Sequence, residues 1–262
     1  MMKRKRVNNI PLVFSDENLS YAWGKAFLEA MKPGVGKLQL LVVSVNSPDG
    51  GAVIEDFNMR QALDVELSRL KGLSTETVAT TIFPNSLWNP NANRQQLYER
   101  YLRVLPTLEK IDQRNRFGLY FGRMIAFDSN GCNQLEQVVT TYKKGNHRPT
   151  ALQVAIFDPN RDHSHQRRKG FPCLQQVAFA LTGDGGLAVT GFYGAQHLFE
   201  RGYGNYLGLY NLGLFMSHEL GLRLTQMNCV ASVALAKGGD IRKSDLEDLK
   251  QIVSEALPSS GE

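Results

Sequence analysis

Apolar positions recur at helical spacing in several segments of the chain. Trp23, Phe27 and Met31 stand four positions apart, which predicts an amphipathic helix over residues 19–31. Ser74-Thr75-Glu76 places a capping serine ahead of a further helix, and Ser244-Asp245-Leu246-Glu247 has the capping-box pattern that opens the last one. Residues 208–222 are apolar almost throughout, which predicts a helix buried on most sides. Helices are also expected over residues 57–73, 95–108 and 133–144.

Apolar runs bounded by turn residues predict the strands. Gly183-Asp184-Gly185-Gly186 separates two of these runs, so we expect a hairpin there. Helices and strands are mixed without the regular alternation of a Rossmann domain, and no linker divides the chain. The prediction is an α+β fold with residues 1–262 as a single domain, of which residues 1–18 form a flexible basic segment. Strands are expected over residues 37–45, 152–157, 176–181, 187–193 and 224–235.

Composition narrows the class of protein. The 262 residues are 42% hydrophobic and 21% charged, which is ordinary for a globular chain. No apolar run approaches the roughly 20 residues needed to cross a bilayer, and no long apolar stretch follows the basic start, so neither a membrane span nor a signal peptide is expected. A net charge of +5 favours anionic ligands without requiring nucleic acid, which we do not expect as a partner. Three cysteines argue against a disulfide framework and for a reducing, cytoplasmic location.

Cys173 is the first candidate for chemistry. It follows Pro172 and leads into the strand predicted over residues 176–181. A thiolate there could attack an electron-poor ring carbon, such as C6 of a pyrimidine, if a nearby cation or backbone donors lower its pKa. The alternative is a buried structural cysteine.

Three further side chains have suitable chemistry. The forked guanidinium of Arg201 can bind two phosphate oxygens. The amide of Asn211 offers both a donor and an acceptor to the edge of a base. Glu76 stands at a predicted helix start, where burial could raise its pKa and make it an acid or a base. The alternatives are a surface arginine, a capping or buried asparagine, and a structural glutamate.

Taken together, these stretches resemble thymidylate synthase and its pyrimidine hydroxymethylase relatives. The resemblance runs from about residue 20 to residue 238. Pro172-Cys173 resembles the family's nucleophile, and Arg201 its phosphate-binding arginine. Asn211 matches the asparagine that reads a uracil edge, and Glu76 the glutamate that assists proton transfer. Arg148 lies near the family's phosphate-binding arginine pair, and Arg167 and Arg168 are candidates to replace it.

The chain departs from the family pattern at several positions. Leu174 replaces the histidine that follows the nucleophile, and Gly204 replaces an aspartate on the folate side of the site. The His-x-Tyr pair that holds the sugar aligns with residues 231–234, where it is lost. Elsewhere, His163-Ser164-His165 is a weak metal pattern that is usually solvent-exposed, so no metal site is expected.

The resemblance implies a thymidylate synthase-like mixed sheet with flanking helices, packed against its twin in a homodimer. It also implies methyl or hydroxymethyl transfer to C5 of a pyrimidine nucleotide, favouring a uracil-type base, with 5,10-methylenetetrahydrofolate as donor. Cys173 and Glu76 would be catalytic, and Arg201, Asn211, Arg148, Arg167 and Arg168 would bind the substrate. The alternative is a catalytically inactive homologue that binds a nucleotide or a partner protein.

Overall fold

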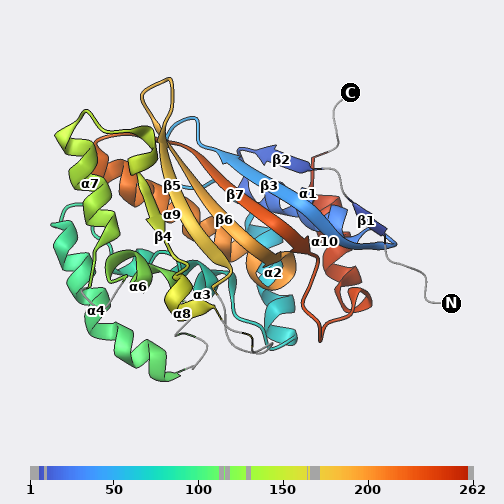
Figure 1. The fold of residues 1–262 in the computed structure, drawn as a ribbon. Coiled ribbons are helices and arrows are strands. Elements are labelled where there is room, and N and C mark those ends of the chain that lie inside the picture. The colour runs from blue at the N-terminus through green and yellow to red at the C-terminus, as the bar shows by residue number, and fades with distance from the viewer. Residues whose placement is uncertain are drawn as a thin grey trace.

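A seven-stranded mixed sheet organises the chain (Figure 1). The computed structural model describes residues 6–8, 11–111, 115, 119–127, 131–163, 165 and 172–258. The strand order is β1-β3-β7-β6-β5-β4, with β2 beside β1 on the same edge of the long strand β3. Strands β6 and β7 are parallel, while β3–β7, β5–β6 and β4–β5 are antiparallel. The strands are β1 (Arg6–Asn8), β2 (Leu12–Asp16), β3 (Val35–Asn46), β4 (Gln153–Ala155), β5 (Leu174–Leu181), β6 (Leu187–His197) and β7 (Leu224–Leu235).

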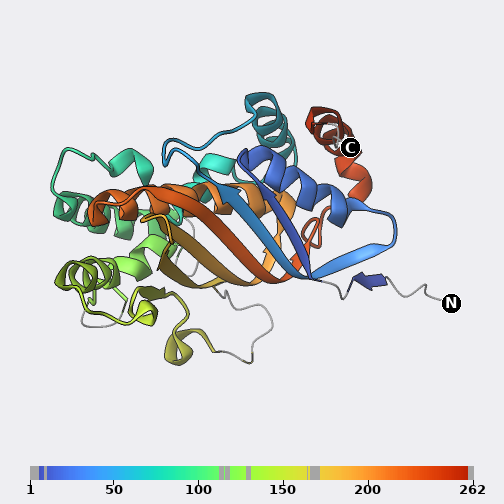
Figure 2. The ribbon, with the colours of Figure 1, turned by 90° about the horizontal axis from the view of Figure 1, so that it is seen from above.

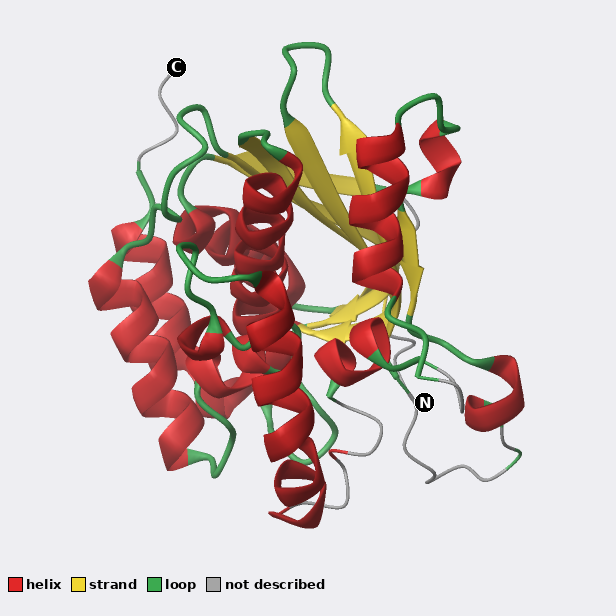
Figure 3. Ribbon diagram, turned by 90° about the vertical axis from the view of Figure 1, so that its left-hand side faces the viewer, coloured by secondary structure: helices red, strands yellow, loops and turns green. Residues whose placement is uncertain are grey.

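Most of the helices lie to one side of this sheet (Figure 2 and Figure 3). Helices α1 and α9 pack directly on it, and no helix of the described chain covers the opposite face of β3, β7 and β6. The helices are α1 (Leu19–Met31), α2 (Phe57–Arg69), α3 (Thr75–Thr80), α4 (Arg94–Ile111), α6 (Tyr120–Ile125), α7 (Gln134–Lys144), α8 (Pro159–Asp162), α9 (Tyr203–Leu220) and α10 (Glu247–Ala256). Short turns of 3-10 or π-helix are η1 (Asn85–Leu87), η2 (Pro149–Ala151), η3 (Leu198–Gly202) and η4 (Lys243–Leu246).

The mixed α+β prediction is confirmed, and the predicted elements are present with shifted ends. Helix α1 and strand β7 have the predicted bounds. Ser74 caps α3 by accepting a hydrogen bond from the backbone N–H of Thr77. The largest shift is in α9, which begins five residues before the predicted start at residue 208. Its first turns contain two glycines, a residue that disfavours helices, but these turns are buried in the core.

The N-terminal segment differs from the prediction of a flexible tail. Residues 12–16 form β2, which pairs in parallel with residues 41–45 of β3. The side chain of Asp16 binds Lys25 of α1 at 2.7 Å, and Leu12 and Phe14 pack against the core. The alternation of apolar and polar residues in Leu12-Val13-Phe14-Ser15 is the period of a strand, and it outweighs the basic residues before it.

Helix α9 is the central element of the core. Fifteen of its 18 residues are buried, and His218 in its last turn is exposed. Gly204 and Gly208 face α3 one turn apart, and a Cβ on Gly204 would lie 2.5 Å from Val78 Cβ and 2.6 Å from the Thr75 carbonyl oxygen. The two backbones can approach this closely only because these positions lack side chains.

The uncovered face of the sheet carries both apolar and polar side chains. Val42, Val230 and Phe192 form one row across β3, β7 and β6. The next row contains Ser44, Asn228 and Thr190, and Asn228 donates a hydrogen bond to Thr190 at 3.4 Å. The face therefore alternates apolar and polar rows.

The contact between α3 and α9 gives a stability prediction. In Gly204→Ala the new methyl group would overlap Val78 and the Thr75 carbonyl, so we expect the free energy of unfolding to fall by about 1–3 kcal/mol. Urea denaturation measures this change. Gly183→Ala is the control, because nothing lies within 4 Å of its Cβ, and its effect should stay within about 0.5 kcal/mol. Equal stabilities of the two variants would show that α3 does not pack this tightly.

Candidate functional site

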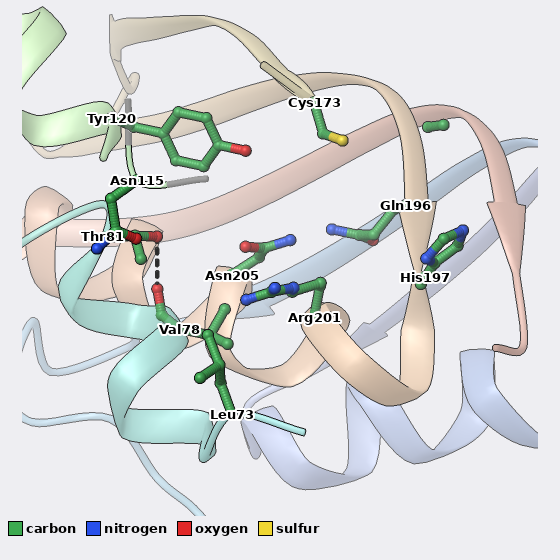
Figure 4. A pocket seen from close by; sticks show the side chains of 11 residues that line it. Leu73, Val78, Thr81, Asn115, Tyr120, Cys173, Gln196, His197, Arg201 and Asn205 are labelled. Atoms are coloured by element: carbon green, nitrogen blue, oxygen red, sulfur yellow. Dashed lines mark hydrogen bonds between the residues drawn. The ribbon is translucent and has the colours of Figure 1, made fainter. Parts of the chain in front are cut away.

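A cavity of about 350 Å³ opens where α3, α6, β6 and the start of α9 meet (Figure 4). This size is within the range of small-molecule sites. Its described lining contains a thiol, a guanidinium, an imidazole, a phenol and three amides, but no carboxylate. The lining residues are Leu73, Val78, Thr81, Asn115, Tyr120, Cys173, Ala195, Gln196, His197, Arg201 and Asn205.

Cys173 immediately precedes β5, and its sulfur points into this cavity (Figure 4). The Gly194 N–H donates to the Cys173 carbonyl oxygen at 3.0 Å, so strand β6 holds the backbone of the cysteine in place. The side chain is reached by solvent but is surrounded by protein on the other sides. Burial raises the pKa of the Cys173 thiol, and the positive charge of Arg201 acts in the opposite direction. The thiol form therefore prevails at neutral pH.

Tyr120, at the start of α6, directs its hydroxyl toward Cys173 (Figure 4). Burial and the neighbouring cysteine raise the pKa of Tyr120 to about 12, although backbone hydrogen bonds and Arg201 oppose the shift. The phenol therefore keeps its proton at neutral pH and can donate a hydrogen bond to a ligand or to a thiolate.

Arg201 and Asn205 reach the cavity from η3 and the first turn of α9 (Figure 4). Arg201 is half-buried, and in the described part of the chain no carboxylate lies within ion-pair distance of its guanidinium. Three other arginines, Arg60, Arg94 and Arg123, each bind an acidic side chain. Arg201 is thus a partly desolvated cation that is available to an anion from outside the chain.

The walls of the cavity are held by hydrogen bonds. The Tyr206 hydroxyl donates to Gln196 Oε1 at 2.9 Å, and Gln196 Nε2 donates to Cys229 Sγ at 3.5 Å. These contacts fix the orientation of the Gln196 amide at the end of β6. A preorganised amide loses little entropy when a ligand binds.

A buried ion pair anchors the helix that carries Tyr120. Arg123 of α6 binds both carboxylate oxygens of Asp162 at 2.6 and 2.9 Å and donates to the Ile156 carbonyl. Burial alone would raise the pKa of Asp162, but the hydrogen bonds from Arg123 and from the Asp158 N–H lower it below its ordinary value. The pair therefore stays charged at neutral pH and ties α6 to α8 and to the end of β4.

The structure brings together only some of the residues predicted from the sequence. Cys173 and Arg201 line the same cavity. Glu76 is exposed, and its carboxylate accepts a hydrogen bond from Arg60 at 2.8 Å instead of lining this cavity. Asn211 is buried on α9, two turns beyond Asn205, and it is not part of the lining. Arg148 is an exposed residue at the start of η2.

Two predicted residues, Arg167 and Arg168, lie outside the residues that the structure describes. No group of three potential metal-binding side chains occurs in the described residues. No helix in the same part of the chain is long and apolar enough to cross a membrane.

Sequence reasoning missed Asn205, Gln196, His197 and Tyr120. Asn205 stands four residues after Arg201, so a helix starting earlier than predicted would have placed both on one face. For Gln196 and His197 the sequence signal was weaker. They follow the strand predicted over residues 187–193, and a longer strand would have placed them at its C-terminal end.

Neither the known protein families nor the curated proteins include a sequence match to this chain.

The electrostatics of the cavity predict the pH dependence of alkylation at Cys173. Burial raises the pKa of this thiol and Arg201 lowers it, so Arg201→Gln should raise it further. The rate of iodoacetamide labelling, followed at each cysteine by mass spectrometry, should therefore reach its midpoint at a higher pH in Arg201→Gln. Cys229, which is buried with a pKa raised to about 12, should label more slowly than Cys173.

Arg103→Gln is the matched control, because Arg103 is an exposed residue of α4 outside the described cavity lining. Its labelling midpoint should equal that of the unaltered protein. An identical midpoint in Arg201→Gln would show that the guanidinium does not act on the thiol.

Proposed function

We propose that this protein binds a pyrimidine nucleotide and transfers a one-carbon group to C5 of its ring. The observation that carries the proposal is the half-buried Arg201 guanidinium, which has no acidic partner in the described chain and lines one cavity with Cys173. Such a cation binds a phosphate through paired charge-assisted hydrogen bonds. Cys173 and Arg201 are two of the residues that the family resemblance implies. The mixed α+β fold is compatible with the thymidylate synthase-like fold that the resemblance also implies.

In this proposal Cys173 is the nucleophile. Its thiolate adds to C6 of the ring, so that a C–S bond forms and the ring electrons move to C5 and the C4 oxygen. C5 then adds to the carbon of a one-carbon electrophile at the oxidation level of formaldehyde, whose C–O or C–N π bond breaks as its heteroatom takes up a proton. C5 next loses its own proton, and elimination of the thiolate restores the C5–C6 double bond. Because burial keeps the resting thiol protonated, a base must first remove its proton, and we assign this role to His197, whose imidazole belongs to the described lining.

The carboxamides of Asn205 and Gln196 suit the edge of a uracil-type base. Each has a donor and an acceptor, and both line the cavity with Cys173. We assign base reading to this pair because Asn211, which the resemblance favours, lies in the interior of α9.

The described residues do not fit 5,10-methylenetetrahydrofolate in the way that the resemblance implies. The family's aspartate would fall at Gly204, where even a Cβ would meet Val78 and Thr75 of α3. The described cavity lining also contains no carboxylate. No step of the proposal therefore depends on this donor, and the experiment below tests for it separately.

The raised pKa of Cys173 favours a second candidate function, in which the protein binds the nucleotide without transforming it. A neutral thiol is a weak nucleophile, and Glu76, the proton shuttle that the resemblance implies, binds Arg60. Binding and chemistry therefore need separate measurements.

Binding is tested by calorimetric titration with deoxyuridine 5′-monophosphate. Arg201→Ala removes the bidentate phosphate contact, so we expect affinity to fall by on the order of 2–4 kcal/mol. Arg201→Lys should restore part of the lost affinity. Arg103→Ala should keep the affinity of the unaltered protein, because Arg103 lies outside the described lining. Unchanged affinity in Arg201→Ala would remove Arg201 from the site.

Chemistry is tested without any donor. Reversible addition of Cys173 to C6 makes the C5 hydrogen exchangeable, so the nucleotide should gain deuterium at C5 in D₂O, as seen by mass spectrometry. Cys173→Ser should abolish the exchange, whereas Cys132→Ser should retain it. Addition of 5,10-methylenetetrahydrofolate then shows whether a C5-substituted product forms. Nucleotide binding without exchange would favour the non-catalytic function.

We also propose that two copies of the chain pair through the uncovered face of the sheet. Val13 is 65% exposed and Phe192 37% exposed there, and the buried Ser44 hydroxyl has no hydrogen-bond partner among the described atoms. The same face of a second copy would cover the apolar rows and offer hydrogen-bond partners to the polar rows.

Light scattering at micromolar concentration should therefore give the mass of a dimer. Phe192→Lys places a charge in the middle of the face, where Phe192 pairs with Val230, and should shift the protein to monomer. Phe57→Lys is the control, since Phe57 is 74% exposed on α2, away from the uncovered sheet face. A monomer in the unaltered protein would count against the family fold as well as the interface.

A further inference from the structure

A second cavity, of about 510 Å³, adjoins the candidate site. It lies where the end of β7 meets the start of β3, two segments that the pairing of Ala234 with Leu38 brings together (Figure 1). His197 lines both cavities, so a ligand could pass from one to the other along this side chain. The remaining lining residues of the second cavity are Gly34, Val35, Gly36, Leu235, Ala236, Lys237, Gly238, Gly239, Arg242 and Lys243.

The second cavity is positively charged. Lys237, Arg242 and Lys243 line it, and its described lining contains no carboxylate. Lys243 is committed to structure, because its Nζ donates to the carbonyls of Ala30, Lys32 and Val35 at 2.5, 3.1 and 2.9 Å. In the described chain, Lys237 and Arg242 have no acidic side chain within ion-pair distance. Their donors are therefore available to an anion.

Three acidic residues stand close to this loop, and none of them lines the cavity. The Glu200 carboxylate accepts a hydrogen bond from the Gly238 N–H at 2.5 Å through Oε1, while its buried Oε2 has no hydrogen-bond partner among the described atoms. The Asp245 carboxylate accepts a hydrogen bond from the Arg242 N–H at 2.8 Å, and Asp240 is exposed. Four glycines do line it, and glycine lets a ligand approach the backbone closely.

The two cavities belong to one framework. The Phe199 N–H donates to the Ala236 carbonyl at 2.9 Å, and Glu200 holds Gly238. These bonds tie the loop of the second cavity to η3, the element that carries Arg201 in the first. The cations of the two cavities therefore belong to connected backbone segments, and His197 lines both cavities.

We propose that the second cavity binds a second phosphate of the same ligand, so that the preferred ligand is a pyrimidine nucleotide phosphorylated on both sides of its sugar. Arg201 takes the 5′-phosphate, and Lys237 with Arg242 takes the 3′-phosphate. This inference rests on the proposed function. The doubly phosphorylated unit can be a free nucleoside 3′,5′-bisphosphate or an internal residue of a short strand.

Calorimetric titration with three probes tests the proposal: deoxyuridine 5′-monophosphate, deoxyuridine 3′,5′-bisphosphate, and a single-stranded trinucleotide with a central deoxyuridine. The bisphosphate should bind about tenfold more tightly than the monophosphate, or better, because it gains charge-assisted hydrogen bonds. Lys237→Ala/Arg242→Ala should abolish this preference and leave monophosphate affinity unchanged. Tight binding of the trinucleotide identifies a strand as the source of the second phosphate, and its weak binding identifies a free nucleotide.

Gly239→Leu tests the same cavity without removing charge. Nothing lies within 4 Å of a Cβ at Gly239, so the new side chain should enter the cavity and block the second phosphate without disturbing the fold. Gly183→Leu is the matched control, since Gly183 is equally open and belongs to the turn between β5 and β6. Lys143→Ala/Lys144→Ala removes two charges from α7 and controls for net charge. Both controls should keep the preference.

Equal affinities of the unaltered protein for the monophosphate and the bisphosphate would overturn this inference and leave the proposed function intact. A preference that survives both Lys237→Ala/Arg242→Ala and Gly239→Leu would also overturn it. No binding of any of the three probes would overturn both proposals.

Discussion

The close contact between α9 and α3 is the constraint on which the candidate site depends. Helix α9 is buried along most of its length, and glycines at 204 and 208 let α3 approach its backbone. This approach puts Val78 of α3 on one wall of the cavity. Arg201 of η3 and Asn205 in the first turn of α9 lie on another. Packing in a dense core transmits even small volume changes, so a side chain at Gly204 would act on the shape of the site as well as on stability.

The same contact excludes the aspartate that the resemblance to thymidylate synthase would place at position 204. A carboxylate at position 204 and the observed position of α3 are mutually exclusive, because both would occupy the space next to Val78. The cavity that results has no described carboxylate and a cation without an acidic partner. Removing a guanidinium from water without an ion-pair partner is costly. An anionic ligand offsets that cost, which is the physical basis of the nucleotide proposal.

Two opposing effects set the pKa of the Cys173 thiol and therefore its reactivity. Burial favours the neutral form and Arg201 favours the thiolate, and burial has the larger effect. A phosphate on Arg201 would weaken the support that this cation gives to the thiolate. Catalysis would therefore need a base beside Cys173, and in the proposed function the imidazole of His197 has this role.

Local patterns in the chain were enough to predict most helices and strands and two residues of the candidate site. Three elements could be predicted because the spacing of side chains along a helix or strand follows from backbone geometry alone. They are the helix over residues 19–31, the apolar helix α9 and the strand over residues 224–235. Cys173 and Arg201 could be predicted as site residues because their thiol and guanidinium groups have distinctive chemistry.

Which side chains come together in the cavity depends on how distant segments pack. Glu76 and Asn211 had suitable chemistry, but the directions of α3 and α9 turn Glu76 toward Arg60 and keep Asn211 in the interior. Strand β6 extends four residues beyond its predicted end and brings Gln196 and His197 to the cavity. Such contacts join residues far apart in the chain, and they depend on strand register and helix packing, which local sequence patterns do not specify.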